Sequence, residues 1–227
     1  MNNDRLSISE IYNSIQGEST WAGLPCIFVR LAGCHLRCAY CDSAFAFSGG
    51  QSMSLESIVE EAQQLGGTLV QVTGGEPLLQ NGCHELMRRF CDLGWTVLLE
   101  TSGSCVISEV DERVHRIVDI KTPGSGEGAS FDLRNLDVLT ERDEVKFVIT
   151  DREDFDWAAG FVSQHSLAKR AGAVLFAPVS PQAACEVAGC DGLPPSELAA
   201  WLLETKTPAR LQLQIHKVIW EPQERGR

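Results

Sequence analysis

Short apolar runs rich in β-branched residues recur along this chain, and most of them are separated by segments with helical spacing. Six strand-like runs cover residues 26–31, 68–73, 95–100, 116–121, 144–149 and 173–178, a last run covers 210–215, and helical segments cover 54–65, 82–93, 152–168 and 195–205. Strands that alternate with helices form parallel sheets. A closed barrel of this kind needs eight strands. We therefore expect an α/β fold, a partial (incomplete) TIM-like barrel with about six parallel strands.

Polar motifs follow these runs. Residues 33–41 contain three cysteines, 74–77 read Gly-Gly-Glu-Pro, 100–103 read Glu-Thr-Ser-Gly, 119–121 read Asp-Ile-Lys, and 216–217 read His-Lys. Parallel strands bring their carboxyl ends to one edge of a sheet, where barrel enzymes carry their chemistry. The motifs therefore predict one shared site.

The cysteines Cys34, Cys38 and Cys41 have the spacing Cys-x3-Cys-x2-Cys. Three thiolates can hold three irons of a [4Fe–4S] cluster and leave the fourth iron open to a small molecule. A closed zinc site needs four ligands, usually in two separated pairs, and His35 is too close to Cys34 to complete one without strain. A disulfide scaffold is disfavoured because the nine cysteines are an odd number and no secretory signal precedes them.

Chain length, hydropathy and net charge indicate the number of domains and the partners that the protein can bind. The 227 residues suit a single domain, 1–227, in which 33–43 form the cluster loop and the tail 218–227 is peripheral. No run reaches the roughly 20 apolar residues of a membrane-spanning helix, so we expect a cytoplasmic protein without a membrane partner. A net charge of -12 repels phosphate backbones, so we expect no direct nucleic-acid binding.

The cysteine spacing is the signature of radical S-adenosylmethionine (SAM) enzymes, and the chain resembles that superfamily. Residues 74–76 match a Gly-Gly-Glu motif that contacts the amino group of SAM in these enzymes, and Tyr40 matches the aromatic residue that lies next to the adenine. The resemblance implies that the open iron binds SAM and that an electron cleaves it to a 5′-deoxyadenosyl radical. The cofactor supplies this chemistry, while the protein positions and shields it.

Further motifs make the chain similar to the 7-carboxy-7-deazaguanine synthases. They are Gln-Gly-Glu at 16–18, Arg30 before Ala-Gly-Cys at 32–34, Cys-Asp-Ser at 41–43, Thr73 before the glycines, and the late His-Lys. The resemblance spans residues 8–217. It implies a ring contraction of 6-carboxy-5,6,7,8-tetrahydropterin to 7-carboxy-7-deazaguanine with loss of ammonia, a step toward 7-deazapurine nucleosides such as queuosine, in which SAM is regenerated.

The resemblance also implies roles for single residues. Glu18 and His216 are expected to be catalytic, and Ser43 is expected to bind Mg²⁺. Cluster ligands are expected to be Cys34, Cys38 and Cys41. Substrate contacts are expected from Gln16, Gly17, Glu18, Arg30, Thr73 and His216. SAM contacts are expected from Tyr40, Gly74, Gly75, Glu76, Glu100, Ser102 and Lys121.

The side chains suit these roles chemically. Glu18 offers acceptor oxygens to the donor nitrogens of a pterin edge, and the Arg30 cation suits a carboxylate. His216 can exchange a proton near neutral pH, and the Ser43 hydroxyl suits Mg²⁺, which takes few protein ligands. Taken alone, Arg30 is equally typical of a salt bridge within a sheet, and His216 of a solvated or packed histidine.

Two other functions fit parts of the pattern. A glycyl-radical-activating enzyme also carries Cys-x3-Cys-x2-Cys on a short chain, but the motifs at 16–18 and 41–43 argue against it. A zinc-binding module would contain zinc without iron or sulfide. The synthase resemblance further implies a homodimer, and we expect a low-potential flavodoxin or ferredoxin as the electron donor.

Some features have no predicted role. Six further cysteines match no motif: Cys26, Cys83, Cys91, Cys105, Cys185 and Cys190. Residues 178–182 are less like the family pattern, and the chain continues to residue 227, beyond the His-Lys motif.

Overall fold

A computed structural model describes residues 4–181, 187–220 and 226, so Cys185 and Gln182 lie outside the described residues. Its strands are β1 Arg5–Ile15, β2 Pro25–Leu31, β3 Gln51–Ser54, β4 Leu69–Gly74, β5 Thr96–Thr101, β6 His115–Asp119, β7 Glu144–Ile149, β8 Ala173–Pro178 and β9 Arg210–Leu211. Its α-helices are α1 Leu55–Gln64, α2 Gly82–Asp92, α3 Arg152–Gln164, α4 Leu167–Arg170, α5 Pro195–Thr205 and α6 His216–Ile219.

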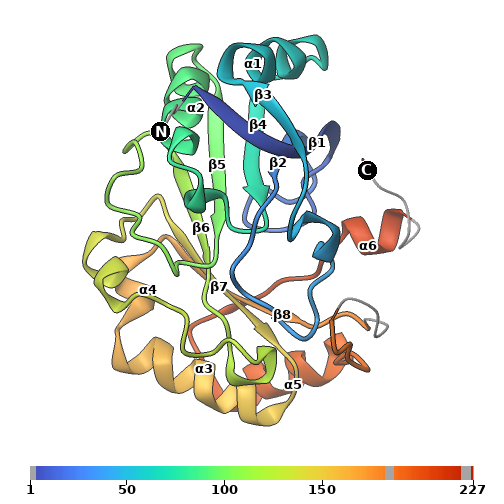
Figure 1. Cartoon of the computed structure of the whole chain (residues 1–227). Helices are drawn as coiled ribbons and strands as arrows, with labels where there is room; N and C mark the ends of the chain where they lie inside the picture. The colour runs from blue at the N-terminus through green and yellow to red at the C-terminus, as the bar shows by residue number, and fades with distance from the viewer. Residues whose placement is uncertain (1–3, 182–186, 221–225, 227) are drawn as a thin grey trace.

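One sheet contains all the strands of the described residues, in the order β3-β1-β2-β4-β5-β6-β7-β8-β9. The strands from β2 through β4 to β9 pair in parallel, whereas β1 runs antiparallel to both β2 and β3. Helices α1 and α2 contact β1 and β5, and α3 and α5 contact β7 and β8 (Figure 1). The sheet is open at β3 and β9, which confirms the α/β fold with an incomplete, barrel-like parallel sheet.

The two faces of this sheet differ in polarity because successive side chains of a strand point to opposite faces. Val70 and Val72 of β4 belong to the hydrophobic core that the helices cover, whereas Gln71 between them points the other way. The strand register also places Asp119 of β6 beside Lys146 of β7. The face opposite the helices therefore carries polar and charged groups.

Several elements differ from the sequence prediction. The antiparallel strands β1 and β3 were not predicted, because their many serine and other polar residues hide the apolar pattern. The predicted helix 152–168 ends at Gln164, and Ser166 has a left-handed backbone (φ 51°) that separates α3 from α4. The predicted strand 210–215 ends at Leu211, so His216 begins a short helix instead of following a strand.

Helix α1 has a capped start that gives a stability prediction. The Ser54 hydroxyl accepts a hydrogen bond from the Ser57 backbone N–H at 3.1 Å. We expect Ser54→Ala to lower the free energy of unfolding by about 1 kcal/mol, the usual value of a lost N-cap. Urea denaturation would measure this, with Ser163→Ala on the exposed side of α3 as the control. Equal midpoints for Ser54→Ala and the wild type would contradict the prediction.

Within these described ranges, no helix has the length and apolar character needed to cross a membrane.

Candidate active site

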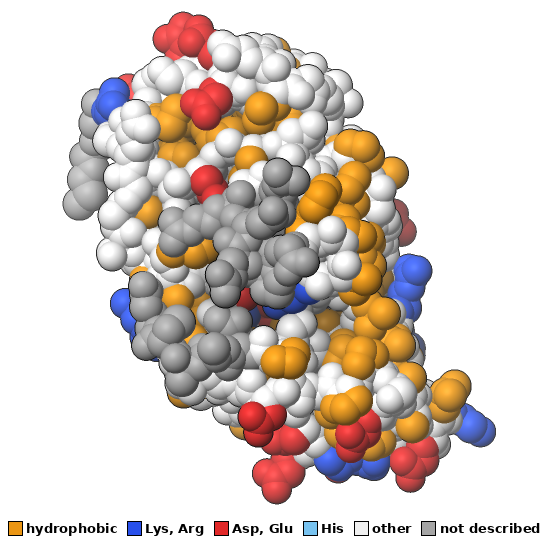
Figure 2. All heavy atoms as spheres, turned by 90° about the vertical axis from the view of Figure 1, so that its right-hand side faces the viewer, with side chains coloured by type: hydrophobic (Ala, Val, Ile, Leu, Met, Phe, Trp, Pro, Cys, Tyr) orange, Lys and Arg blue, Asp and Glu red, His pale blue; other side chains and the backbone are white. Residues whose placement is uncertain are grey.

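A cavity of about 870 Å³ lies against the polar face of the sheet. Figure 2 views the molecule from the side of α6 and shows acidic and basic side chains together within a recess. Of the predicted site residues, Glu76 alone is not among the residues that line it. The others are Gln16, Gly17, Glu18, Arg30, Cys34, Cys38, Tyr40, Cys41, Ser43, Thr73, Gly74, Gly75, Glu100, Ser102, Lys121 and His216. The structure therefore brings the separate motifs together at one site.

The tail also contributes to this cavity. Trp220 and Gly226, two residues of the segment 218–227, line it. Residues 221–225 and 227 lie outside the described part of the chain.

The three predicted cluster ligands lie on one loop after β2. Backbone hydrogen bonds hold this loop, including one from the Ala39 N–H to the Ser125 carbonyl at 2.9 Å. Cys34, Cys38 and Cys41 are free thiols. Burial raises the pKa of all three, that of Cys38 to about 11, so the neutral thiols are favoured and a nearby cation would promote their ionisation.

This donor set fits an iron–sulfur cluster better than a single metal ion. Among the described residues, no group of three His, Cys, Asp or Glu side chains converges on a site for one ion. A cubane cluster bonds each thiolate to a different iron, so its ligands do not need to converge on one point.

The turn at Gly74 and Gly75 lies directly against this loop. A Cβ atom on Gly75 would come within 2.3 Å of the Gly33 carbonyl oxygen and 2.6 Å of the Cys34 Cβ. The backbone also joins the two segments, because the Glu76 N–H donates to the Gly33 carbonyl at 2.8 Å. Glycine is thus required for β4 to reach the cysteine loop at this distance.

Glu76 lies behind the cavity wall, with 1% of its surface exposed. Its carboxylate accepts hydrogen bonds from the Thr101 hydroxyl at 2.7 Å, the Ser102 N–H at 2.8 Å and the Ser102 hydroxyl at 2.6 Å. Glu76 therefore ties the glycine turn to the end of β5.

The loop between β1 and β2 brings Gly17 and Glu18 to the opposite side of the site. The Gly17 carbonyl accepts from the Ile215 N–H at 3.1 Å, and a Cβ on Gly17 would lie 1.9 Å from the His216 Nδ1. His216 therefore packs directly on Gly17. Burial lowers the pKa of His216, which favours its neutral form.

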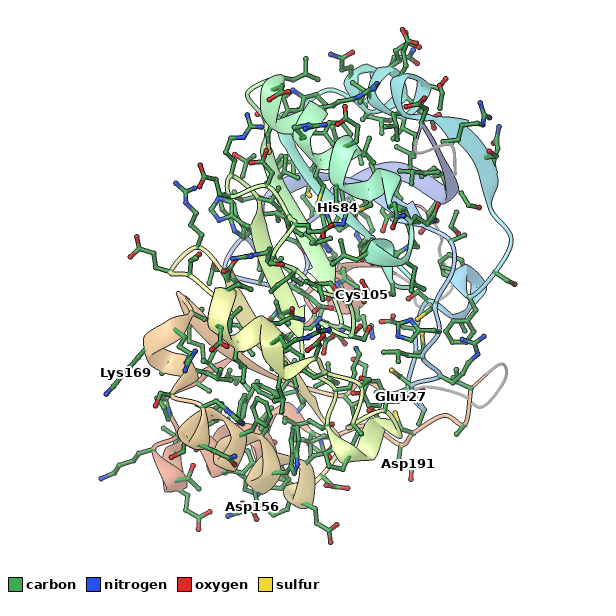
Figure 3. The ribbon with its side chains drawn as sticks, turned by 60° about the vertical axis from the view of Figure 1, so that its left-hand side comes forward. His84, Cys105, Glu127, Asp156, Lys169 and Asp191 are labelled. Atoms are coloured by element: carbon green, nitrogen blue, oxygen red, sulfur yellow. The ribbon has the colours of Figure 1, made fainter. Side chains whose placement is uncertain are left out.

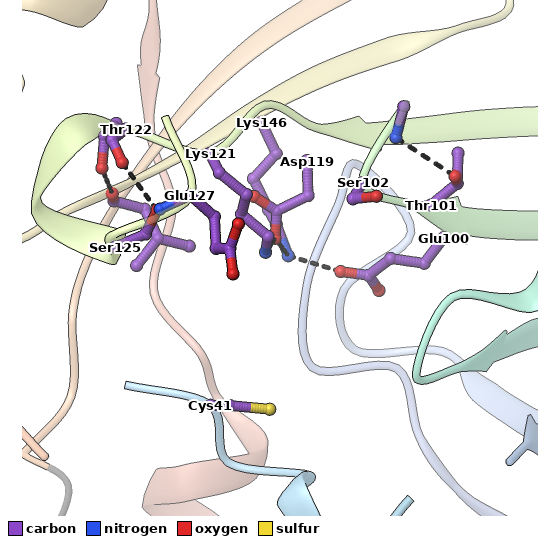
Figure 4. Close-up of polar contacts among 12 residues, drawn as sticks. Cys41, Glu100, Thr101, Ser102, Asp119, Lys121, Thr122, Ser125, Glu127 and Lys146 are labelled. Carbon is purple, nitrogen blue, oxygen red and sulfur yellow. Dashed lines mark hydrogen bonds and ion pairs between the residues drawn. The ribbon is translucent and has the colours of Figure 1, made fainter. Parts of the chain in front are cut away.

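A buried charge cluster joins this loop to the sheet. The Lys146 ammonium lies 2.5 Å from Glu18 and from Glu100, and 3.1 Å from Asp119, while Lys121 lies 3.0 Å from Asp119. Figure 4 shows Glu100, Asp119, Lys121 and Lys146 together, with Cys41 across the site. The predicted residues Glu18, Glu100 and Lys121 are thus parts of one electrostatic unit.

Arg30 was expected either to contact the substrate or to form a salt bridge within the sheet, and its position suits both. It lines the cavity, but its Nε donates to Glu10 at 2.7 Å and its Nη2 to the Tyr12 hydroxyl at 3.0 Å. The salt bridge is therefore present. These contacts use two of the guanidinium nitrogens.

The Cys-Asp-Ser motif is linked to the end of the chain by an ion pair. The Lys217 ammonium lies 2.7 Å from the Asp42 carboxylate. Burial opposes ionisation of Asp42, but the Lys217 cation outweighs it and lowers the pKa of Asp42. Ser43 faces the same cavity, with its hydroxyl 3.9 Å from the Cys41 sulfur.

Sequence reasoning missed Lys146 and Gln71 as members of the site. Each is a polar residue between apolar neighbours within a strand, as Lys146 is between Val145 and Phe147. A polar residue flanked by apolar ones within a strand was the available signal, because such a position faces either a partner or a site.

Comparison with known proteins gives concordant matches. The sequence model of the Radical SAM superfamily matches residues 29–125. A 7-carboxy-7-deazaguanine synthase from Koribacter versatilis is 47% identical over 97% of this chain and 100% of its own length. Another from Chlorobaculum tepidum is 42% identical over 97% of each chain. The crystal structure of QueE from Escherichia coli has a TM-score of 0.72 at 21% identity, over 92% of this chain and 94% of that one, and so supports the fold.

Proposed function

The chain belongs to the 7-carboxy-7-deazaguanine synthase family of radical SAM enzymes, and from that premise we propose that it converts 6-carboxy-5,6,7,8-tetrahydropterin to 7-carboxy-7-deazaguanine and ammonia. The observation that carries the proposal is the single cavity on which the cysteine loop, the glycine turn and the Gln-Gly-Glu loop converge. A [4Fe–4S] cluster and SAM are the cofactors of the superfamily. When bound, they would supply the radical chemistry that abstracts a hydrogen atom from the substrate.

We propose that Cys34, Cys38 and Cys41 hold the cluster. Gly74 and Gly75 let the backbone approach SAM closely, and Tyr40, Glu100, Ser102 and Lys121 supply further contacts from the cavity wall. Glu76 serves SAM through the Ser102 side chain that it holds, because its own carboxylate is buried behind the wall.

For the substrate we propose contacts on the other side of the cavity. Gln16, Gly17 and Thr73 line it beside Glu18, whose carboxylate accepts hydrogen bonds from the donor edge of the pterin. Arg30 attracts the substrate carboxylate, and His216 exchanges a proton during the rearrangement. The Ser43 hydroxyl is the proposed protein ligand of Mg²⁺, which would also bind the substrate carboxylate and waters.

The half-buried His216 gives a prediction for the dependence of stability on pH. Its folded-state pKa lies below its unfolded value, so the unfolded chain binds the extra proton more readily as the pH falls. This contribution to stability is complete above the unfolded pKa of about 6.5 and is lost as the pH falls toward the folded pKa. Between pH 7 and pH 5.5, we expect the Tm of His216→Gln to fall by less than the Tm of the wild type. Parallel Tm curves would show that His216 titrates normally.

Several properties of the working protein are proposals from family membership. We propose one domain over residues 1–227, a homodimer, and reduction by a flavodoxin or ferredoxin, with neither nucleic acid nor membrane as a partner. We also propose a cytoplasmic location, since the eight described cysteines are free thiols and a reducing compartment keeps them so. Light scattering would test the dimer.

An anaerobic turnover assay tests the proposed function. The reconstituted protein would be given SAM, Mg²⁺, a strong reductant and the tetrahydropterin, and the products would be identified by mass spectrometry. We expect many molecules of 7-carboxy-7-deazaguanine per SAM. SAM cleavage to 5′-deoxyadenosine without this product would point instead to an activating enzyme, and zinc without iron would point to a binding module.

A further inference from the structure

Lys146 is a buried cation among three carboxylates that come from different parts of the fold. Glu18 belongs to the loop between β1 and β2, Glu100 to β5 and Asp119 to β6. The Lys146 ammonium is within 2.5 Å of the first two and 3.1 Å of the third, and 3% of its side chain is exposed (Figure 4). No motif in the sequence singles it out.

A second set of contacts fixes the two carboxylates that line the cavity. The Glu18 oxygen that does not contact Lys146 accepts a hydrogen bond from the Gln214 amide at 2.7 Å. The Glu100 oxygen that does not contact Lys146 accepts a hydrogen bond from the Gln71 amide at 2.8 Å. Gln71 in turn accepts a hydrogen bond from the Gln16 amide. Each oxygen of Glu18 and Glu100 therefore has a donor, and Lys146 is the donor that the two share.

The electrostatic consequence of this arrangement is strong because the groups are buried. Opposite charges attract far more strongly inside a protein than in water, and an uncompensated buried carboxylate is costly. Burial opposes ionisation of Glu18, but Lys146 outweighs it and lowers the pKa of Glu18. Burial raises the pKa of Glu100.

Other charged groups also face this cluster. His216 lies near Glu18, and Lys121 pairs with Asp119. Neither is close enough to hydrogen-bond Glu18 or Glu100 among the described contacts. Lys146 is thus the cation that compensates these two carboxylates directly.

We propose that Lys146 is a positioning residue for the substrate: it holds Glu18 and Glu100 at fixed places on the cavity wall, so that Glu18 presents an ionised, immobile acceptor to a donor-rich ligand. This role rests on the proposed function. A purely structural role is a poorer account, since replacing a buried ion pair by apolar residues is often neutral or stabilising. The cluster also faces the cavity, whereas the hydrophobic core lies on the other face of the sheet.

The test compares Lys146→Met and Lys146→Arg in the reconstituted enzyme. We expect Lys146→Met to raise the KM for the pterin roughly 10- to 100-fold, as for other residues that orient a binding group, with smaller loss in kcat. Iron content should stay as in the wild type, and SAM affinity should fall less than pterin affinity, because Glu100 keeps its hydrogen bond from the Gln71 amide. Lys146→Arg keeps the charge and should recover most of the loss. The control is Lys169→Met, because this exposed lysine of α4 projects into solvent (Figure 3).

The pH profile separates positioning from a structural role. Without the Lys146 cation, the pKa of Glu18 rises, so the acid limb of kcat/KM should move to higher pH in Lys146→Met and stay in place in Lys146→Arg. If Lys146→Met does not fold, Lys146→Met with Glu100→Gln removes one charge of each sign, and its acid limb should show the same shift.

The outcomes are distinguishable. This inference alone would be overturned if the wild type is active and the Lys146 variant that folds has the same KM for the pterin and the same acid limb of kcat/KM. A wild type with a loaded cluster that makes no product would overturn the proposed function and, with it, this inference.

Discussion

Alanine in place of Cys34, Cys38 or Cys41 should leave the protein folded but without its cluster and its product. A lost ligand removes a metal–sulfur bond outright, so we expect product formation to fall by more than about 100-fold, beyond the usual effect of groups around a metal site. These thiols line the cavity and are not part of the hydrophobic core cluster, so their removal should cost that core little. Iron and sulfide content, visible absorbance and product yield would be measured together.

Cys105→Ala is the matched control for this series. Cys105, labelled in Figure 3, is also a free thiol; it is partly buried against the hydrophobic core and is not among the residues that line the cavity. We expect it to load the cluster and turn over like the wild type. Full iron loading in any of the three alanine variants would refute the assignment of the cluster ligands.

The fold was largely predictable because most positions of its central parallel strands are buried. A strand such as β8 is buried at every position and therefore reads as a continuous apolar run. β1 could not be found in this way, since its pairing with β2 and β3 supplies backbone hydrogen bonds regardless of its polar side chains. The end of the last strand was also misjudged. The strand stops at Leu211, and the Ile215 N–H donates instead to the Gly17 carbonyl, a contact between distant parts of the chain that places His216.

The site was predictable where a motif is local and unpredictable where it is assembled by the sheet. The cysteine loop and the glycine turn each lie within a few consecutive residues. The charge cluster depends on strand order, since β5, β6 and β7 must be neighbours before Glu100, Asp119 and Lys146 can meet. A single sequence does not contain that order explicitly, so Lys146 appeared only in the structure.

Gly75→Ala should weaken both SAM binding and the fold. The added Cβ would lie 2.3 Å from the Gly33 carbonyl oxygen, which belongs to the backbone and cannot move aside as a side-chain tip can. The cysteine loop must therefore shift away from the glycine turn, and overpacking of this kind costs about 1–3 kcal/mol of stability. We expect SAM affinity to fall at least about tenfold, which corresponds to 1.4 kcal/mol.

Gly160→Ala is the matched control, because an added Cβ at this position in α3 meets nothing within 4 Å. Alanine inside a helix should stabilise the protein by about 0.5–1 kcal/mol relative to glycine and leave SAM binding unchanged. Equilibrium dialysis with SAM and thermal unfolding of both variants would separate the two effects. If Gly75→Ala binds SAM like the wild type, the turn does not need to touch the cysteine loop this closely, and the contact between the two segments is not what shapes the SAM site.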